Sequence, residues 1–454
     1  MNRLGKFSQK RGLFTACCLL LAARCSLFTA RRLAVGGQLL SFLFLITGFD
    51  IVSILMTTSL LPFAALFLSL IFPPANDDRL TKKARAIHSR ILTLDTHADA
   101  PINLQKDGFD IGIAHDVKKD GTQIDFPRMK QGKMDAMFFA VYMAQGPRTP
   151  EGHTAAKEKA LDIFDRIHVA LRKYPALAEL ATSPADAYRI EKLGRRAVFI
   201  GMENGYPVGE DLSLLKTYYD LGCRYITLSH FANNAICDSA TDPDGPIHNG
   251  LSPFGRQVVA EMNRLGIMID VSHISDKSFY DVLALSKAPV VASHSNSRAL
   301  CEFPRNMTDQ MIKDLAAKGG VIQVNFVSDY LRKPSDEHRQ ALNSVRMAGV
   351  GKVVTPEVRA KIEAKTDSIK KVYANERASI TDIVNHIAHI VKLVGIDHVG
   401  IGSDFDGGGG VNGLEDVSEI ENLTLELVRR GYSEADITKI WGGNLLRVLG
   451  QAKK

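Results

Sequence analysis

From residue 80 onward, short apolar segments alternate along the chain with longer amphipathic segments of helical period. Eight of the apolar segments have the length and β-branched content of strands. They are apolar throughout instead of alternating with polar residues, as is typical of strands covered on both faces. The predicted strands span residues 91–96, 135–141, 197–202, 224–229, 267–272, 289–293, 321–326 and 398–403. Strands that alternate with helices indicate a parallel sheet of the α/β class.

The ends of the amphipathic segments carry residues that start and stop helices. Ser252 and Pro253 are typical of an N-cap and a first helical position, and Gly266 is typical of the residue that follows a helix. Ser275 and Thr308 are expected to cap two further helices. Eight strand–helix repeats predict a (β/α)₈ TIM-type barrel with insertions. A doubly wound open sheet is the alternative, although no G-x-G-x-x-G or P-loop motif follows the first strand.

Residues 331–380 interrupt this repeat because they are polar, highly charged and poor in large apolar side chains. We interpret them as a solvent-exposed helical insertion after the strand at 321–326, in a position suited to a lid. A solvated helical excursion without a part in catalysis explains the same pattern equally well.

The first 76 residues differ in kind from the rest of the chain. Residues 37–73 form an apolar run with Asp50 as its only charge, and a membrane span needs about 20 apolar residues. The prediction is therefore a hydrophobic N-terminal region, 1–76, with a transmembrane segment, followed by a catalytic domain, 80–454. One span places that domain on the extracytoplasmic side, whereas two short spans return it to the cytoplasm. A start codon assigned too far upstream would also explain the region.

Charge and cysteine content narrow the class of protein. The net charge is +6, but residues 1–32 contain seven Lys and Arg and no acid, so the remainder is nearly neutral and predicts no nucleic-acid partner. The six cysteines show no CxxC spacing and are interpreted as isolated buried thiols.

The acids and histidines near the ends of the predicted strands form the most informative pattern. In a (β/α)₈ barrel the carboxyl ends of all strands meet at one mouth, where active sites are built. The residues at these ends are His97, Asp99, Glu203, His230, His273, His294 and Asp404. Because so many imidazoles and carboxylates are costly to bury together without a cation or pairing, they predict a metal centre.

Five of these side chains exceed what one catalytic zinc with an open position needs. The set fits two Zn²⁺ ions about 3.5–4 Å apart, bridged by one carboxylate and one water that acts as a hydroxide nucleophile. Glu203 lies between the other ligands in strand order and is the expected bridge. The predicted ligands are His97, Asp99 and Glu203 for the first ion, and Glu203, His273 and His294 for the second.

Three further residues receive roles in substrate binding or proton transfer. Asp404 is the best candidate to accept a proton from the nucleophile and deliver it to the leaving group. His230 is expected to contact an oxyanion or a substrate carboxylate. Arg305 is the nearest candidate cation for a substrate carboxylate, with a surface position in a loop as the alternative.

Seven motifs together resemble the membrane dipeptidase (renal dipeptidase) family, a branch of the metal-dependent amidohydrolase-type barrels. The resemblance extends from about residue 83 to residue 450. Its motifs are DTHADAP at 95–101, GMENGYP at 201–207, LSHFANN at 228–234, DVSHISD at 270–276, SHSNSRAL at 293–300, RNMTD at 305–309 and HVGIGSDFDG at 398–407.

This resemblance implies a zinc-dependent dipeptidase on a (β/α)₈ barrel with the same ligands to two zinc ions. It implies that His230 and Arg305 contact substrate and that Asp404 acts in proton transfer. It further implies hydrolysis of dipeptides, often with a D-residue at the C-terminal position, and frequently a homodimer. The C-terminal sequence RVLGQAKK lacks the hydrophobic tail of a GPI signal, so we expect no such anchor.

Two other functions stay open at this point. Hydrolysis of lactams, lactones or N-acyl amino acids would use the same two-metal chemistry, and the insertion at 331–380 puts the substrate range in doubt. A membrane protein whose barrel binds a ligand without catalysis is a different class. The presence of every proposed ligand together with Asp404 argues against a site that has lost its activity.

Overall fold

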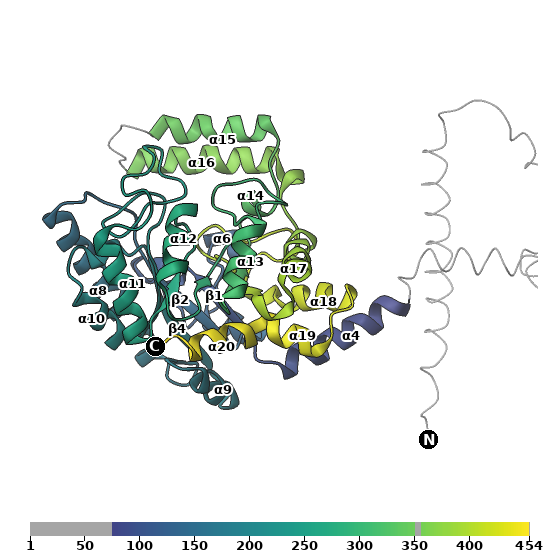
Figure 1. The fold of residues 1–454 in the computed structure, drawn as a ribbon. Coiled ribbons are helices and arrows are strands. Elements are labelled where there is room, and N and C mark those ends of the chain that lie inside the picture. The colour runs from purple at the N-terminus through teal and green to yellow at the C-terminus, as the bar shows by residue number, and fades with distance from the viewer. Residues whose placement is uncertain (1–74, 350–355, 454) are drawn as a thin grey trace, which may run out of the picture. The chain divides into compact units, whose positions relative to one another are not determined.

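The computed structural model describes residues 75–349 and 356–453 of the chain. In this part, eight parallel strands follow one another in the order β1-β2-β4-β5-β6-β7-β8-β9 (Figure 1). Their bounds are β1 Leu94–Ala98, β2 Ala136–Tyr142, β4 Arg196–Glu203, β5 Cys223–Thr227, β6 Met268–Asp270, β7 Val291–Ala292, β8 Val321–Val324 and β9 Val399–Ile401. The predicted parallel α/β barrel is confirmed.

The two ends of the sheet meet beyond β1 and β9 and close the barrel. Ala98 pairs in parallel with Phe405. The amide of Asp404 donates to the carbonyl of His97 at 3.0 Å, and the amide of Asp99 donates to the carbonyl of Phe405 at 2.8 Å. Closure therefore takes place at the carboxyl end of β1, among the residues predicted to bind metal.

One short strand was missed by the sequence pattern, and several strands are shorter than predicted, most of all those at 267–272, 289–293 and 398–403. β3, Ala178–Leu180, pairs with β4 outside the barrel order. Only the first of its three residues, Ala178, is fully buried, and the strand lacks the continuous apolar run that marks the other strands. The predicted strands 267–272 and 289–293 keep only Met268–Asp270 and Val291–Ala292 as paired backbone, because the chain turns outward early to present the polar residues that follow.

The helices cover the outside of the barrel, and the predicted helix starts are confirmed. Ser252, Ser275 and Thr308 each accept a hydrogen bond at the side chain from an amide of the first turn. The helices before the insertion are α4 Ala75–Arg90, α5 Ala100–Leu104, α6 Val117–Asp120, α7 Phe126–Gly132, α8 Pro150–Lys173, α9 Pro184–Lys192, α10 Leu214–Asp220, α11 Pro253–Leu265, α12 Asp276–Leu285 and α13 Asp309–Ala317. After the insertion come α17 Ile380–Val394, α18 Glu421–Arg429, α19 Glu434–Thr438 and α20 Asn444–Gly450.

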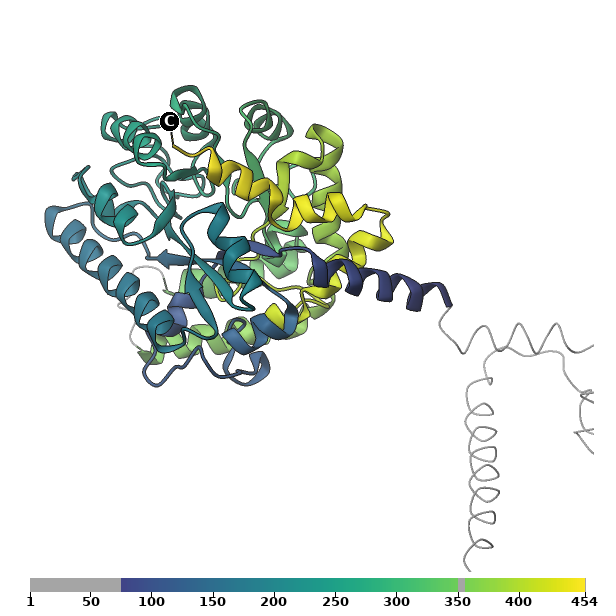
Figure 2. The same cartoon turned by 90° about the horizontal axis from the view of Figure 1, so that it is seen from below.

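The first helix of the described region lies beside two helices from the C-terminal part of the chain. Both views show α4 running along the C-terminal helices α18 and α19 (Figures 1 and 2). Arg85 pairs with Glu421, and Arg90 pairs with Glu434. The buried His88 joins the same interface through Thr424 at 2.7 Å. The contacts hold the chain that enters β1 against the end of the barrel.

Apolar side chains fill the barrel below its mouth. Phe138 stacks on Phe199 with ring centroids 4.7 Å apart and lies 5.2 Å from the ring of Tyr225. These side chains belong to an interior cluster that is separate from the larger core between strands and helices. The three buried free cysteines of the described region, Cys223, Cys237 and Cys301, agree with the prediction of isolated thiols.

The predicted insertion is helical. It contains α14 Ser328–Leu331, α15 Asp336–Gly349 and α16 Pro356–Val372, followed by a 3₁₀ turn at Ala374–Glu376. Helices α15 and α16 pack against each other across one end of the barrel (Figure 1). Its helical character is confirmed, whereas a lid function stays a prediction.

Residues 75–454 group into one compact unit. No helix in the described ranges is both long and apolar enough to cross a membrane. The predicted transmembrane segment within 37–73 lies outside the described residues, so membrane attachment stays a prediction.

One buried histidine ties the active-site side of the barrel to the insertion. His386, on α17, accepts a hydrogen bond from the amide of Ser297 at 3.1 Å and donates to the carbonyl of Leu331 at 3.0 Å. A neutral imidazole satisfies both contacts. Burial lowers the pKa of His386 from 6.5 to about 4, because the charged ring would lose its hydration.

This pKa predicts a loss of stability in acid. Below pH 6.5 the unfolded chain takes up a proton at His386 that the folded chain refuses, so the free energy of unfolding falls as the pH drops toward 4. For metal-free protein, the difference in the free energy of unfolding between wild type and His386→Gln should fall by about 2 kcal/mol from pH 7.5 to pH 5. Urea unfolding at each pH measures it. Parallel pH profiles for the two proteins would contradict the assignment.

Candidate active site

The structure brings all seven predicted strand-end residues together at the carboxyl end of the barrel. His97 lies in β1 and Glu203 is the last residue of β4, while the others follow within three residues of their strands. All seven are buried: His97, Asp99, Glu203, His230, His273, His294 and Asp404. The early ends of the strands, followed by turns, expose these side chains to one another and not to solvent.

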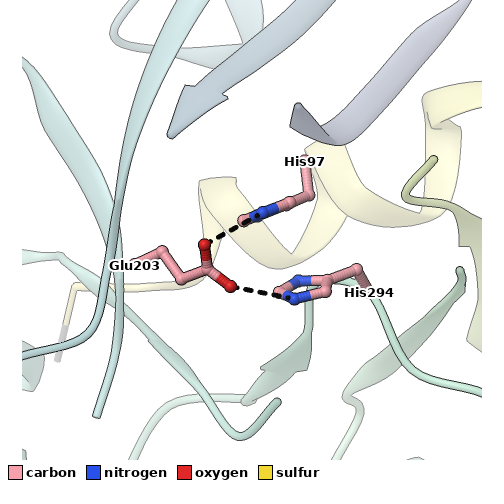
Figure 3. Close-up of side chains that lie close together, drawn as sticks. All are labelled: His97, Glu203 and His294. Atoms are coloured by element: carbon pink, nitrogen blue, oxygen red, sulfur yellow. Dashed lines mark ion pairs between the residues drawn. The ribbon is translucent and has the colours of Figure 1, made fainter. Parts of the chain in front are cut away.

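Glu203 occupies the centre of the cluster and divides it. Its Oε2 lies 3.5 Å from Nε2 of His97. Its Oε1 lies 3.1 Å from Nε2 of His273 and 3.2 Å from Nε2 of His294. Figure 3 shows the carboxylate beside the stacked rings of His97 and His294, with a different oxygen directed at each. A carboxylate that bridges two metal ions needs this division of its oxygens.

The nitrogen atoms of the cluster crowd one another in a way that favours a cation. Nε2 of His273 and Nε2 of His294 are 2.9 Å apart, and the rings of His97 and His294 stack at 3.7 Å. Nε2 of His97 and Oδ1 of Asp99 have no hydrogen-bond partner among the described residues. Imidazole and carboxylate are the ligands that Zn²⁺ takes in catalytic sites, so the donor set fits the predicted metal.

Three overlapping groups of side chains offer ligand atoms within 4.8 Å of one another. They are His97 with Glu203 and His294, Glu203 with His230 and His273, and His97 with Asp99 and Asp404. Glu203 and His97 each belong to two groups. The predicted division between two ions differs in placing His294 with His273, and the spacing of the atoms permits either grouping of His294.

In the absence of a cation, two carboxylates of the cluster differ in how readily they ionise. Burial and the negative charge of Glu203 raise the pKa of Asp99 to about 8. Burial also opposes ionisation of Glu203, but the surrounding histidines hold its pKa well below the usual range. Burial lowers the pKa of His294 to about 3, so this ring is neutral and has a free lone pair. A divalent cation would favour both carboxylates in the ionised form.

Asp404 lies at the rim of the cluster and is held by a residue that the sequence pattern missed. Its backbone has the left-handed φ of 61°, and its Oδ2 accepts a hydrogen bond from Nδ2 of Asn325 at 2.9 Å. Asn325 follows β8 directly, so it obeys the rule that identified the other residues. The sequence pattern does not single it out, because an uncharged amide carries no signal for metal binding or proton transfer.

Arg305 is buried, so the alternative of a surface loop position is wrong. Its guanidinium donates to Oγ of Ser295 and to the carbonyl of His294, both at 2.6 Å. Its Nε has no hydrogen-bond partner among the described residues. The ring of His230 contacts the rings of Tyr142 and Phe231.

Gly407 brings the loop after β9 against the cluster. A Cβ atom at this position would lie 2.0 Å from Oδ2 of Asp99 and 2.3 Å from Oδ1 of Asp404. The following glycines, Gly408–Gly410, line a cavity of about 730 Å³ together with residues of the insertion. The insertion therefore forms part of a wall beside this loop.

Comparison with known proteins identifies the family. A profile described as membrane dipeptidase (peptidase family M19) matches residues 81–454. The chain belongs to the membrane dipeptidase family. Dipeptidase tcpJ of Claviceps purpurea (strain 20.1) is 33% identical over 339 residues, which cover 73% of this chain and 69% of the relative. The predicted resemblance is confirmed.

Solved structures of membrane dipeptidase relatives share the fold. The probable dipeptidase PvdM from Pseudomonas aeruginosa superposes with a TM-score of 0.74 at 33% identity, covering 83% of this chain and 99% of that one. A metallo peptidase from Rhodobacter sphaeroides, solved with a phosphinate mimic of the dipeptide L-Ala-D-Ala, superposes with a TM-score of 0.65 at 26% identity. The superposition covers 80% of this chain and 99% of the Rhodobacter sphaeroides chain. This membrane dipeptidase family member is therefore a metallo-dipeptidase.

The close approach of Gly407 predicts the effect of one added methyl group. Gly407→Ala should displace the carboxylates of Asp99 and Asp404 and lower turnover by about 10²-fold, as misplacement of reacting groups by about 1 Å does. Gly450→Ala is the control, because its Cβ would meet only Pro184 at an ordinary 3.7 Å. Dipeptide turnover at saturating zinc measures both. Equal turnover of Gly407→Ala and wild type would contradict the close approach of the loop to the two carboxylates.

Proposed function

We propose that this chain is a zinc-dependent dipeptidase that holds two Zn²⁺ ions with Glu203 as the bridging ligand. The observation that carries the proposal is the division of the Glu203 oxygens, with Oε2 facing His97 and Oε1 facing His273 and His294. Asp99 completes the first set, since its Oδ2 lies 3.7 Å from Nε2 of His97. The dipeptide mimic bound by the Rhodobacter sphaeroides relative supports a dipeptide substrate.

Zinc ions at this centre would supply Lewis-acid polarisation of the scissile carbonyl and a water that is acidic near neutral pH. The protein holds the ligands in place through buried contacts. Nδ1 of His97 meets the hydroxyl of Tyr225 at 2.7 Å, and Nδ1 of His294 meets the hydroxyl of Ser293 at 2.7 Å. Fixing the second ring nitrogen orients a histidine ligand toward its metal.

Asp404 is the proposed proton carrier. The Asn325 amide holds its Oδ2, which leaves Oδ1 directed toward the Asp99 side of the site, where both oxygens approach the Gly407 backbone. A carboxylate held in this way can accept a proton from the attacking water and give it to the departing amine. The left-handed backbone at Asp404 turns the side chain into the mouth of the barrel.

Arg305 and His230 are the proposed substrate contacts. Two guanidinium nitrogens of Arg305 fix the loop after β7, and its remaining N–H groups are available to a substrate carboxylate. Nε2 of His230 lies 3.5 Å from Oε1 of Glu203, close enough for its ring to contact an oxyanion beside the metal. The second candidate, hydrolysis of lactams, lactones or N-acyl amino acids, would use the same residues.

Membrane attachment through residues 37–73 and a homodimer remain further proposals.

The direct test combines metal analysis with a substrate panel on the full chain. Zinc-loaded protein should contain two Zn²⁺ per chain and hydrolyse L-L and L-D dipeptides. Chelation should abolish turnover, and added zinc should restore it. N-acyl amino acids and lactones, assayed in parallel, should be poor substrates. Absence of dipeptide turnover by protein carrying two zinc ions would contradict the proposed dipeptidase function.

The role of Asp404 is tested by replacing one oxygen. Asp404→Asn should lower kcat by about 10²-fold or more, because the amide cannot take up a proton, while both zinc ions stay bound. Asp406→Asn is the matched control. Asp406 is a carboxylate in the same loop with a similar φ of 64°, but it accepts from the backbone of Gln123. Unchanged kcat in Asp404→Asn would remove the proton-transfer role.

A further inference from the structure

Asp270, the last residue of β6, is a buried carboxylate below the cluster and is outside the proposed ligand set. Four donors surround it. Oδ1 accepts from the amides of Ser272 and Ser293 at 3.0 and 2.8 Å. Oδ2 accepts from the hydroxyl of Ser293 at 2.6 Å and from the hydroxyl of Thr227. The carboxylate thus joins three strands directly below the site.

This arrangement fixes the acceptor to which the Ser293 hydroxyl donates its proton. A carboxylate only accepts hydrogen bonds, and a serine hydroxyl has a single proton to donate. The Ser293 proton therefore points to Asp270. In its contact with Nδ1 of His294, at 2.7 Å, Ser293 can only accept. It follows that Nδ1 of His294 carries the proton of the neutral ring.

The other nitrogen of His294 then has its lone pair free. This atom, Nε2, lies 3.2 Å from Oε1 of Glu203 and 2.9 Å from Nε2 of His273. A neutral imidazole binds a metal through its unprotonated nitrogen. The chain of contacts from Asp270 through Ser293 therefore presents the lone pair of His294 on the side of the proposed metal centre.

We propose that Asp270 is a positioning residue that selects the metal-binding tautomer of His294 through the hydroxyl of Ser293. The inference rests on the proposed zinc centre and adds the device that prepares one of its ligands. The corresponding contact of His97 lacks this property. The Tyr225 hydroxyl can donate to Nδ1 of His97 or accept from it, so that contact alone leaves both tautomers available.

The chain of hydrogen bonds from Asp270 through Ser293 to His294 is called the relay below. Asp270→Asn tests the direction in which its protons point. The amides of Ser272 and Ser293 need an acceptor, so they hold the new amide oxygen at the position of Oδ1. The new NH₂ group then takes the position of Oδ2 and donates to the oxygen of Ser293. The Ser293 proton turns to Nδ1 of His294, and Nε2 of His294 becomes protonated on the side of the metal.

The affinity of the full chain for Zn²⁺, measured by competition with a chromophoric chelator, should reflect this reversal. Asp270→Asn should bind one of its two zinc ions, the one that His294 would hold, about 10–100-fold less tightly than wild type, the range found when partners of metal ligands are lost. Ser293→Ala removes the contact with Nδ1 of His294, so neither tautomer is imposed. This variant should therefore lose less zinc affinity than Asp270→Asn. In the Ser293→Ala background, adding Asp270→Asn should change the zinc affinity little, because its route to His294 is gone.

Thr227→Val is the matched control. It removes the other hydroxyl that donates to the same oxygen of Asp270, and Thr227 has no contact with His294 in the relay. Its zinc affinity should stay near that of wild type even where the thermal stability of the metal-free protein falls. Thermal unfolding of all metal-free variants separates loss of stability from loss of affinity.

Each result decides one of the two claims. Wild-type protein that binds fewer than two zinc ions overturns the proposed centre and, with it, the relay. If wild type binds two, equal affinity of Asp270→Asn and wild type overturns the relay alone. Losses that add fully in the double variant, or a loss in Thr227→Val as large as that in Asp270→Asn, also overturn the relay. The predicted pattern of three variants and the control supports it.

Discussion

The active site depends on the burial of negative charge at Glu203. Its carboxylate is almost fully buried, and imidazole nitrogens approach both of its oxygens. A buried carboxylate is stable only with compensating positive charge or hydrogen bonds. Asp99, whose pKa rises to about 8 through burial and the charge of Glu203, is a second carboxylate whose ionised form needs a compensating positive charge. Two cations shared by Glu203 would satisfy both carboxylates and use the lone pairs of the histidines.

The barrel makes this arrangement possible because it fixes the backbone from which each ligand projects. Closure between His97 and Asp404 joins the first and last strands at the height of the proposed metal ligands. Below them, apolar rings fill the interior, and hydroxyl and carboxylate groups such as those of Ser293 and Asp270 form a polar layer. Proposed ligands such as His97 and His294 are therefore held by hydrogen bonds from the protein itself.

The strand order and the residues of the cluster could be predicted because both follow from local patterns. An apolar run that ends in a histidine or acid needs no knowledge of distant contacts. Asn325 and Asp270 escaped prediction for the opposite reason, since their importance lies in contacts with Asp404 and Ser293 on other strands. The burial of Arg305 was likewise hidden, because its partners, Ser295 and the carbonyl of His294, are met only after the loop folds back. The short strand β3 lacked an apolar run to reveal it.

X-ray absorption spectroscopy at the zinc edge would detect a pair of ions bridged by Glu203. In fully loaded protein we expect a zinc–zinc scattering path at about 3.5–4 Å, together with imidazole nitrogen and carboxylate oxygen ligands. In Glu203→Gln, this path should disappear while the histidines remain. A zinc-loaded wild-type protein without a zinc–zinc path in that range, or a path unchanged in Glu203→Gln, would contradict the proposed bridged pair.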